Sequence, residues 1–398
     1  MGGPERKARV ISTGCISNLL DGTGFEQLLQ RSGYSLTRSL SEADLLILNT
    51  CAFSSGKEEE AVGLIKKIRS KTNPHAKIIV GGCLPAINRE RLAALPHDLE
   101  FRPKDVSPLL DFLNCDGLPE ESNASAISYS QFSLLKRSIW QARTVVDHAR
   151  FLNRSSWMRR LVSPLFIYSN GVCCIRVGMG CHGECSYCAI RFAKGMCSSR
   201  SFDDIVADAR RAADNGFEKL VLVGDEITAW GDGSTNGATV LDIISAILED
   251  CRVKELYLES FEPSFAANNL EQLVNVLSSG RIPVFCSSLQ SGSDRILGLM
   301  RRAYTASDFL GSMSTIRARC PHVLLRTEFM VGFPSETDED FRLSLELARE
   351  LRADFLRVHG YTDRPGTPAS RMGNKVPENV IRSRRRRMLR THWWNQLR

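Results

Sequence analysis

The sequence has no run of 18 apolar residues, so we expect no helix that spans a membrane. Its first residues, MGGPERKARVIST, lack the long apolar run of a secretory signal peptide. Cysteine is sparse by the standard of disulfide-rich domains, with 13 in 398 residues, and the number is odd. These absences argue against membrane and small secreted proteins. They favour a cytoplasmic chain whose cysteines take part in metal or redox chemistry.

The length predicts two or three domains, and an apolar content of 43% is enough for a sizeable core. Buried strand patterns alternate with helical patterns in residues 8–114, which predicts an α/β domain with a parallel sheet. Residues 171–375 repeat the alternation with six strand–helix units. A complete barrel of this type needs eight units, so an incomplete (β/α)6 barrel is predicted. Residues 115–170 are predicted to be a basic linker with some helix, and residues 376–398 a basic helical tail.

The net charge of +7 is concentrated in two places. Residues 131–160 carry seven Lys and Arg side chains against one acid, and residues 382–398 carry seven Arg and no acid. Clustered positive charge of this kind can bind phosphates. The alternative is that these stretches are only solvated helix faces. Trp393 and Trp394 lie in the second stretch. They could stack on bases, but we expect them to pack against the barrel.

Three cysteines, Cys181, Cys185 and Cys188, lie in GMGCHGECSYCAI with the spacing C-x3-C-x2-C. The stretch follows a predicted strand, and the loops after the strands of a barrel carry its active site. Thiolates are soft ligands that suit zinc and iron–sulfur clusters. A structural zinc site needs four ligands, and no second cysteine pair lies nearby, although a zinc loop stays the alternative. A four-iron cluster on three cysteines would leave one iron open for another ligand.

Cys15, Cys51 and Cys83 end three similar segments, ARVISTGC, DLLILNTC and AKIIVGGC. Each segment reads as a strand followed at once by its cysteine. The carboxyl ends of parallel strands lie at one edge of a sheet, where ligands bind. We therefore expect the three thiols to converge on one metal. The alternative is three separate buried thiols that pack as small apolar side chains.

The spacing of Cys181, Cys185 and Cys188, with Tyr187 before the last of them, resembles the signature of the radical S-adenosylmethionine (SAM) superfamily. The resemblance implies a [4Fe-4S] cluster on these cysteines, whose open iron binds the amino and carboxylate groups of SAM. It also implies reductive cleavage of SAM to a 5′-deoxyadenosyl radical, which takes hydrogen from an unactivated carbon. The incomplete barrel is the fold of that superfamily.

A narrower resemblance, to the radical SAM methylthiotransferases, covers about residues 8–114 and 171–375. It implies a second, auxiliary [4Fe-4S] cluster on Cys15, Cys51 and Cys83 that takes part in sulfur insertion. Members of that family usually end in a small β-barrel substrate-binding domain. Nothing after residue 375 alternates like strands, so we expect that domain to be absent. The motifs that carry the resemblance are GCISN, NTCAF, GGC, LVGDEITAWG, LQSGSDRILGLMRR, EFMVGFPSETDEDF and YTDRPGTPAS.

Bound SAM needs polar partners at the mouth of the barrel. The candidates are polar residues at or just after the ends of predicted strands, and each could equally be an ordinary polar residue of a barrel mouth. No catalytic residue beyond the cluster ligands is assigned. The predicted SAM contacts are Asp225, Glu226, Glu259, Ser260, Gln290, Ser291 and Arg326, with Glu328 on the same strand as Arg326.

The resemblance implies an enzyme that inserts a methylthio group at an unactivated C–H bond. A modified adenosine of tRNA is the first choice of substrate, because the basic linker and tail suit RNA phosphates. The alternatives are a ribosomal-protein aspartate, or sulfur insertion into a small molecule or peptide. A different alternative is an iron–sulfur protein without catalysis. An electron donor such as flavodoxin or ferredoxin is a further expected partner.

Overall fold

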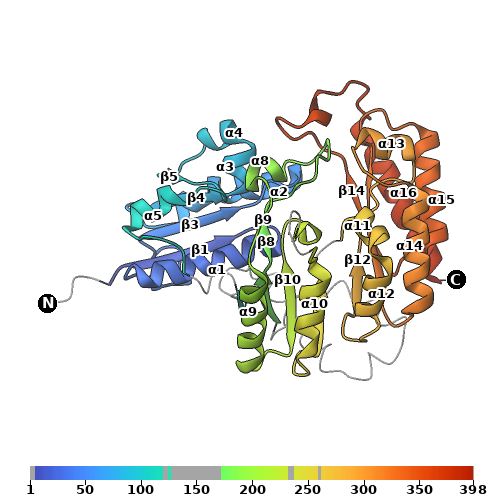
Figure 1. Ribbon diagram of the computed structural model, residues 1–398. Coiled ribbons are helices and arrows are strands. Elements are labelled where there is room, and N and C mark those ends of the chain that lie inside the picture. Colours follow the sequence, from blue (N-terminus) through green and yellow to red (C-terminus); the bar gives the residue numbers. More distant parts are fainter. Residues whose placement is uncertain (1–4, 120–123, 127–171, 232–236, 259–260, 398) are drawn as a thin grey trace.

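The computed structural model describes residues 5–119, 124–126, 172–231, 237–258 and 261–397. Two α/β units lie side by side, one built on the N-terminal sheet and one on a curved set of later strands (Figure 1). The predicted α/β fold class is therefore confirmed. The basic stretch 131–160 lies outside the described residues. In the part that is described, every helix is too short or too polar to cross a bilayer.

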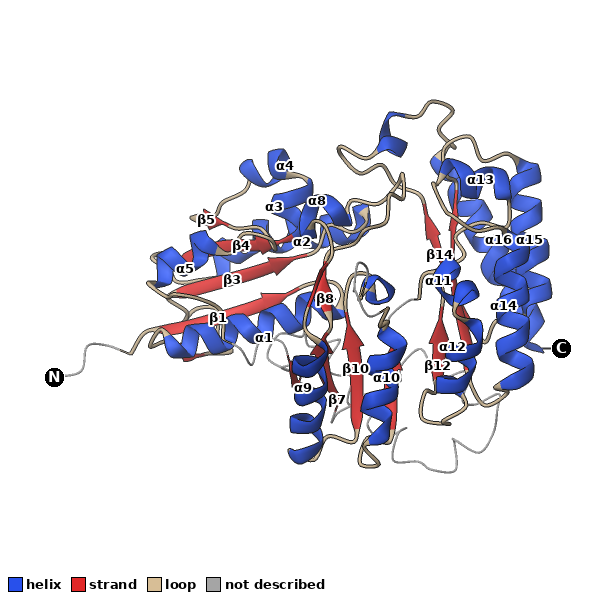
Figure 2. Cartoon of the chain, in the orientation of Figure 1, coloured by secondary structure: helices blue, strands red, loops and turns tan. Residues whose placement is uncertain are grey.

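The N-terminal sheet consists of parallel strands in the order β2-β1-β3-β4-β5. Its three long strands coincide with the predicted apolar runs. All six residues of β3 are buried, because helices cover both faces of the sheet. Figure 2 shows this layering. The elements are β1 (Lys7–Ser12), α1 (Ile16–Arg31), β2 (Ser35–Leu36), β3 (Leu45–Thr50), α2 (Ser55–Ile68), a 3₁₀ turn (Arg69–Lys71), β4 (Lys77–Gly82), α3 (Cys83–Ile87), α4 (Arg89–Ala93), β5 (Leu99–Glu100) and α5 (Ser107–Leu113).

Six parallel strands form the open barrel in two groups, β11-β10-β7 and β12-β13-β14, so the predicted (β/α)6 barrel is confirmed. A bridge between Phe261 and Ser287 joins the groups. The strands are β7 (Val172–Arg176), β10 (Lys219–Val223), β11 (Glu255–Leu258), β12 (Val284–Cys286), β13 (Leu324–Val331) and β14 (Phe355–Gly360). The helices are α8 (Ile190–Lys194), α9 (Phe202–Asp214), α10 (Val240–Glu249), α11 (Pro263–Asn268), α12 (Leu270–Leu277), α13 (Asp294–Leu299), α14 (Ala306–Arg319), α15 (Asp338–Leu351) and α16 (Glu378–Leu397), with 3₁₀ turns at Ile227–Ala229 and Pro368–Arg371.

Short-range sequence signals set where several barrel helices begin. Thr239, Thr305 and Thr337 each precede a helix, and an aspartate follows three residues later. Each threonine and its aspartate satisfy backbone N–H groups at the helix start in a reciprocal capping box. The helices α10, α14 and α15 therefore start where the local sequence dictates.

Five short strands of the described residues were not predicted: β2 and β5 at the two edges of the N-terminal sheet, and β6, β8 and β9 outside it. β6 (Ala124–Ala126) pairs antiparallel with β7, inside the segment expected to be a linker with some helix. β8 (Gly178–Met179) and β9 (Ser198–Ser199) pair antiparallel with each other and enclose the loop that carries Cys181, Cys185 and Cys188. Strands of two or three residues are too short to show a hydrophobic period, so only tertiary pairing reveals them.

Each unit packs a helix into the other. Ile16 and Leu20 of α1 are buried against residues of the barrel strands, among them Val221. In return, Ala189 and Ala193 beside and within α8 join the core of the N-terminal unit. The two loops that precede these helices carry cysteines, so reciprocal packing brings both cysteine sets to the interface between the units.

Helix α16 packs along α15 and β14 at the outer side of the barrel (Figure 1). Arg384 points inward and forms ion pairs with Glu336, at 2.6 Å, and with Asp338, at 2.7 Å. Trp393 and Trp394 are 58% and 62% exposed, so the expectation that they pack against the barrel is wrong. The reason is geometric, because residues such as Arg384 and Met388 occupy the inner face of this helix.

Candidate functional site

The loop of Cys181, Cys185 and Cys188 runs between β8 and α8 and is held by its own backbone. The Cys188 N–H donates to the Cys185 carbonyl at 3.1 Å. Two further backbone N–H groups donate to sulfur, from Gly183 to Cys181 Sγ at 3.1 Å and from Ile190 to Cys188 Sγ at 3.5 Å. Such donors stabilise negative charge on sulfur, so this loop suits thiolate ligands.

Burial raises the pKa of the Cys188 thiol to about 12 and that of Cys181 to about 11. An isolated thiol with such a pKa keeps its proton at neutral pH. A coordinated metal removes that proton, because binding to the cation favours the thiolate. These cysteines are therefore suited to metal binding rather than to acting as free nucleophiles.

Arg302 is a neighbour of this loop that the sequence did not reveal as a site residue. Its Nη1 donates to Cys185 Sγ at 3.0 Å. Its Nε donates to the Tyr304 hydroxyl at 2.9 Å, and Glu262 lies 3.5 Å from its Nη2. The guanidinium is therefore fixed on several sides, and it places a permanent positive charge against one of the three sulfurs.

The other three thiols follow three strands of the N-terminal sheet. Cys15 precedes α1, Cys51 follows β3, and Cys83 begins α3. Burial raises the pKa of the Cys83 thiol, and negative charge on Cys15 or Cys51 raises it further. The three thiols thus lie on loops that follow strands at one edge of the parallel sheet.

The polar residues of the cysteine motifs fasten the three loops together. The Asn18 side chain donates to the carbonyls of Thr13 and Thr50, each at 3.1 Å. Asn49 Nδ2 donates to the Asn18 carbonyl at 2.7 Å, and the Thr50 hydroxyl donates to the Gly81 carbonyl at 2.6 Å. These residues of the cysteine motifs therefore have a structural role, because they fix the three loops in one arrangement.

Gly14 packs directly against Cys51. Its φ is +109°, and a Cβ added there would lie 2.4 Å from Cys51 Cβ and 2.7 Å from Cys51 Sγ. A side chain at this position would therefore be strained and would also displace a thiol.

We expect Gly14→Ala to lose the auxiliary iron while it keeps the rest, so that iron per chain falls from about eight to about four. The matched control is Gly63→Ala in the middle of α2, where an added Cβ meets nothing within 4 Å. Iron and sulfide analysis of anaerobically reconstituted protein measures the effect. Full iron content in Gly14→Ala would contradict the prediction.

The geometry of both cysteine sets bears on the zinc alternative. Each set supplies three thiols and no fourth protein ligand is assigned to either. A structural zinc site needs four ligands, whereas a [4Fe-4S] cluster on three cysteines leaves one iron open. Three thiols therefore fit a [4Fe-4S] cluster better than zinc.

The structure describes five of the seven predicted SAM contacts, while Glu259 and Ser260 lie outside the described residues. Asp225 accepts a hydrogen bond from the Gly180 N–H at 2.9 Å, just before Cys181. Glu226 accepts from the Thr228 N–H at 3.2 Å, and its burial raises its pKa. Both carboxylates follow β10 and lie near the loop of Cys181.

Gln290 and Ser291 are neighbours in sequence but lie in different surroundings. Gln290 has φ of +72°, and its buried Oε1 has no hydrogen-bond partner among the described residues. Ser291 is fully buried, with its hydroxyl 3.4 Å from that of Ser344 on α15. Gln290 is thus available to a ligand, whereas the Ser291 hydroxyl already has a neighbouring hydroxyl in Ser344.

Arg326 and Glu328 lie on β13, with Arg326 Nη2 3.0 Å from Glu328 Oε1. Burial would raise the pKa of the Glu328 carboxyl. A hydrogen bond from His359 and the charges of Arg326 and Arg357 outweigh burial and hold that pKa at about 2. Glu328 is therefore a permanent anion at the wall of the barrel.

A cavity of about 80 Å³ lies where the two units meet. Cys188 lines it from the barrel, together with Gln290 and Glu328. Phe53 and Ser54, which follow Cys51 by two and three residues, line it from the N-terminal unit. In this cavity, the surroundings of both cysteine sets border one space.

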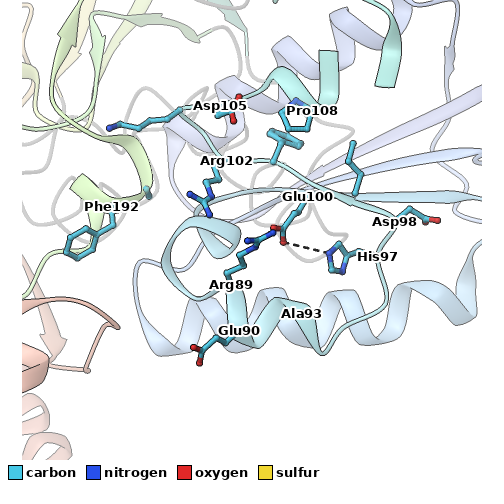
Figure 3. A pocket seen from close by; sticks show the side chains of 14 residues that line it. Arg89, Glu90, Ala93, His97, Asp98, Glu100, Arg102, Asp105, Pro108 and Phe192 are labelled. Carbon is cyan, nitrogen blue, oxygen red and sulfur yellow. Dashed lines mark hydrogen bonds and ion pairs between the residues drawn. The ribbon is translucent and has the colours of Figure 1, made fainter. Parts of the chain in front are cut away.

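A larger hollow of about 1120 Å³ lies on the N-terminal unit, between α4, β5 and Phe192 (Figure 3). Arg89 and His97 both approach Glu100 within it. None of the cysteines that the structure describes lines this hollow, and its charged residues are of both signs. Despite its size, we therefore do not assign the chemistry to it.

Two family models match the chain. The uncharacterized protein family UPF0004 matches residues 7–101, and the radical SAM superfamily matches residues 175–348. The tRNA-2-methylthio-N(6)-dimethylallyladenosine synthase of Carboxydothermus hydrogenoformans is 29% identical, over 96% of this chain and 82% of the relative. The enzyme of that name from Corynebacterium diphtheriae is 28% identical, over 97% of this chain and 72% of the relative.

The chain belongs to the radical SAM methylthiotransferase family. This methylthiotransferase is therefore a radical SAM enzyme, and SAM and [4Fe-4S] clusters are its cofactors. Its fold is also that of the radical SAM methyltransferase TsrM from Kitasatospora setae, with a TM-score of 0.61 at 15% identity over 92% of this chain and 77% of that chain. The cobalamin-dependent radical SAM enzyme OxsB shares the fold, with a TM-score of 0.55 at 11% identity over 92% of this chain and 55% of that chain.

Proposed function

We propose that this methylthiotransferase inserts a methylthio group at an unactivated C–H bond of a modified tRNA adenosine. The observation that carries the proposal is the cavity between the units, which borders Cys188 on one side and the segment after Cys51 on the other. A substrate atom held there would be near both cysteine sets. The tRNA adenosine is proposed because the relatives are named as synthases of 2-methylthio-N(6)-dimethylallyladenosine in tRNA.

We further propose a division of labour between the domains. Residues 8–114 would hold the auxiliary cluster on Cys15, Cys51 and Cys83, and residues 171–375 would hold the SAM cluster on Cys181, Cys185 and Cys188. When bound, the clusters and SAM supply an electron, an adenosyl radical and sulfur. An electron donor such as flavodoxin or ferredoxin belongs to this proposal. The proposed SAM contacts are Asp225, Glu226, Glu259, Ser260, Gln290, Ser291 and Arg326.

The protein's own residues would prepare the site. Arg302 keeps Cys185 in place through its hydrogen bond to the sulfur. The oxygen of Gln290 that lacks a partner among the described residues can accept a hydrogen bond from a ligand in the cavity. Phe53 and Tyr361 border the same cavity and offer apolar surface that excludes water from it.

The exposed face of α16 supports RNA as the substrate. Arg382, Arg386 and Arg390 are exposed and recur every four residues, about one helical turn or 6 Å along the axis. Trp393 and Trp394 extend the same surface with exposed rings. A row of guanidinium groups next to exposed aromatic rings suits phosphates and unstacked bases.

Replacing Arg382, Arg386 and Arg390 together with Gln is expected to weaken tRNA binding and to reduce its salt dependence. The slope of log affinity against log salt should fall by about one for each phosphate that no longer meets an arginine. The control is Lys66, Lys67 and Lys71 replaced with Gln, which removes the same charge from an exposed part of the N-terminal unit. Equal effects of the two triple variants, measured by filter binding at several salt concentrations, would refute a specific role for α16.

The direct test uses reconstituted protein with SAM, dithionite and tRNA. The tRNA is supplied with and without the dimethylallyl modification of its adenosine. We expect a methylthio mass gain in the digested nucleosides, and only with the modified tRNA. Formation of 5′-deoxyadenosine is measured in the same reaction.

A methylthio gain on ribosomal protein or in a metabolite pool, with none on tRNA, would replace the proposed substrate. Absence of 5′-deoxyadenosine under every condition would reject catalysis altogether. In that case the alternative of a non-catalytic iron–sulfur protein would stand.

A further inference from the structure

A buried lysine lies between the two cysteine sets. Lys194 is the last residue of α8, directly after the loop of Cys188, and its side chain is 1% exposed. Its Nζ donates to the Ser17 hydroxyl of α1 at 2.7 Å. The side chain therefore reaches from the barrel into the N-terminal unit, and its ammonium group is removed from water.

The ammonium group is balanced by two carboxylates from different units. Asp225, after β10, lies 3.4 Å from Nζ, and Asp21 of α1 lies 4.0 Å from it. Arg176 supplies a second buried cation, which pairs with Asp21. These contacts compensate the large cost of burying a charged lysine, so this position requires a cation.

The ammonium group lies beside the loops of the auxiliary thiols. Ser17, which accepts its hydrogen bond at 2.7 Å, follows Cys15 by two residues in the first turn of α1. Asn18, the next residue of that helix, donates at 3.1 Å to the carbonyl of Thr50, which directly precedes Cys51. Ala193, the residue before Lys194, packs in the same core as Cys83. The buried charge of Lys194 therefore lies next to the loops that carry all three auxiliary thiols.

The contacts of Lys194 continue to the other cysteine loop. Asp225 pairs with Lys194 through one oxygen and accepts the Gly180 N–H at 2.9 Å through the other. Gly180 immediately precedes Cys181, and the Cys181 N–H donates to the carbonyl of Gly195, next to Lys194, at 3.0 Å. A single buried network thus joins the loop of Cys181 to the loop of Cys15.

We propose that Lys194 is a positioning residue whose buried charge stabilises the reduced auxiliary cluster and holds the two cysteine loops in register. An iron–sulfur cluster on three thiolates is anionic, and it becomes more so when it accepts an electron. Net charge and surroundings set the reduction potential of such clusters. A fixed cation in a low-dielectric interior acts strongly over short distances, so it favours the reduced form.

The test is a redox titration of the full-length protein, followed by the electron paramagnetic resonance signal of the auxiliary cluster. Cys181, Cys185 and Cys188 are replaced with Ala, so that only the auxiliary cluster gives a signal. Lys194→Met removes the charge at similar length, and Lys194→Arg keeps it. We expect a more negative midpoint potential for Lys194→Met and a nearly unchanged one for Lys194→Arg. Lys104→Met is the control, because Lys104 is an exposed lysine that lies against Gly195 of the same loop.

An unchanged midpoint in Lys194→Met with full iron content would overturn the proposal. If Lys194→Met takes up no auxiliary iron, Lys194→Gln and Lys194→Arg decide the matter by iron analysis. Iron retained only in Lys194→Arg supports a requirement for charge, whereas loss in all three variants, or retention in Lys194→Gln with an unchanged midpoint, refutes it.

The inference rests on the proposed function only for the presence of the auxiliary cluster. The titration needs no tRNA, so failure of the tRNA assay and failure of this inference are distinguishable.

Discussion

Replacing Cys188 with Ala is expected to abolish SAM cleavage, whereas Cys51→Ala is expected to leave cleavage and abolish methylthio insertion. The two thiols lie on different units, in two separate three-cysteine sets. Loss of one thiol removes one of only three protein ligands, so the affected cluster should be lost or inactive. Measuring 5′-deoxyadenosine and methylthio nucleoside in the same reaction separates the two outcomes.

The control for this pair is Cys251→Ala, an exposed cysteine in neither set, which should behave as wild type in both measurements. Iron analysis should show about four irons remaining in each of the two cluster variants. If Cys51→Ala abolished 5′-deoxyadenosine formation as completely as Cys188→Ala, the separate roles of the two sets would be wrong.

Glu58→Met is expected to lower the free energy of unfolding by about 3–5 kcal/mol, because it leaves Arg364 buried without its carboxylate. The Glu58 side chain is 2% exposed, and Arg364 Nη1 lies 2.5 Å from it. Arg91 and Asn88 donate to its other oxygen at 2.8 and 2.9 Å. The pair joins α2 to the segment after β14, so its loss should also loosen the interface between the units.

The neighbouring Glu59→Met is the matched control, since Glu59 is 62% exposed and should cost less than about 1 kcal/mol. Burial would raise the pKa of the Glu58 carboxyl, but Arg91 and Arg364 together lower it below its usual value. Its contribution is therefore complete above the unfolded pKa of about 4.3 and is lost as pH falls through the folded value. Urea unfolding at neutral and acidic pH should show the difference between Glu58→Met and Glu59→Met shrink on acidification. A difference that stays constant would contradict this origin.

The strands of both units could be predicted because their signals are local. Continuous apolar runs such as DLLILNT and VCCIRV are typical of parallel strands with both faces covered, and each became one. The positions of Cys15, Cys51 and Cys83 directly after such runs were enough to expect the three thiols at one edge of the sheet. In the structure, hydrogen bonds of Asn18, Asn49 and Thr50 tie these three loops together.

The residues that complete the site could not be predicted in this way. Arg302 meets Cys185 from 117 residues away, Lys194 meets Ser17 from 177, and Arg364 meets Glu58 from 306. None of these arginines or lysines stands out in sequence, because its partner depends on how two domains pack. Position at a strand end also does not show that Gln290 lines the cavity while the Ser291 hydroxyl lies beside that of Ser344 on α15.

The sequence by itself determined the order of the main strands and helices along the chain, the two sets of three cysteines and the chemistry that thiols at such spacings support. Those features depend on hydrophobic period and on spacing within a few residues, which a linear string records. Only the tertiary structure decided that α1 enters the barrel and α8 enters the N-terminal core. This reciprocal packing of α1 and α8 places both cysteine sets around one cavity and next to buried charges. The sequence does not show it, because contacts between residues far apart in the chain depend on how the two folded units pack together.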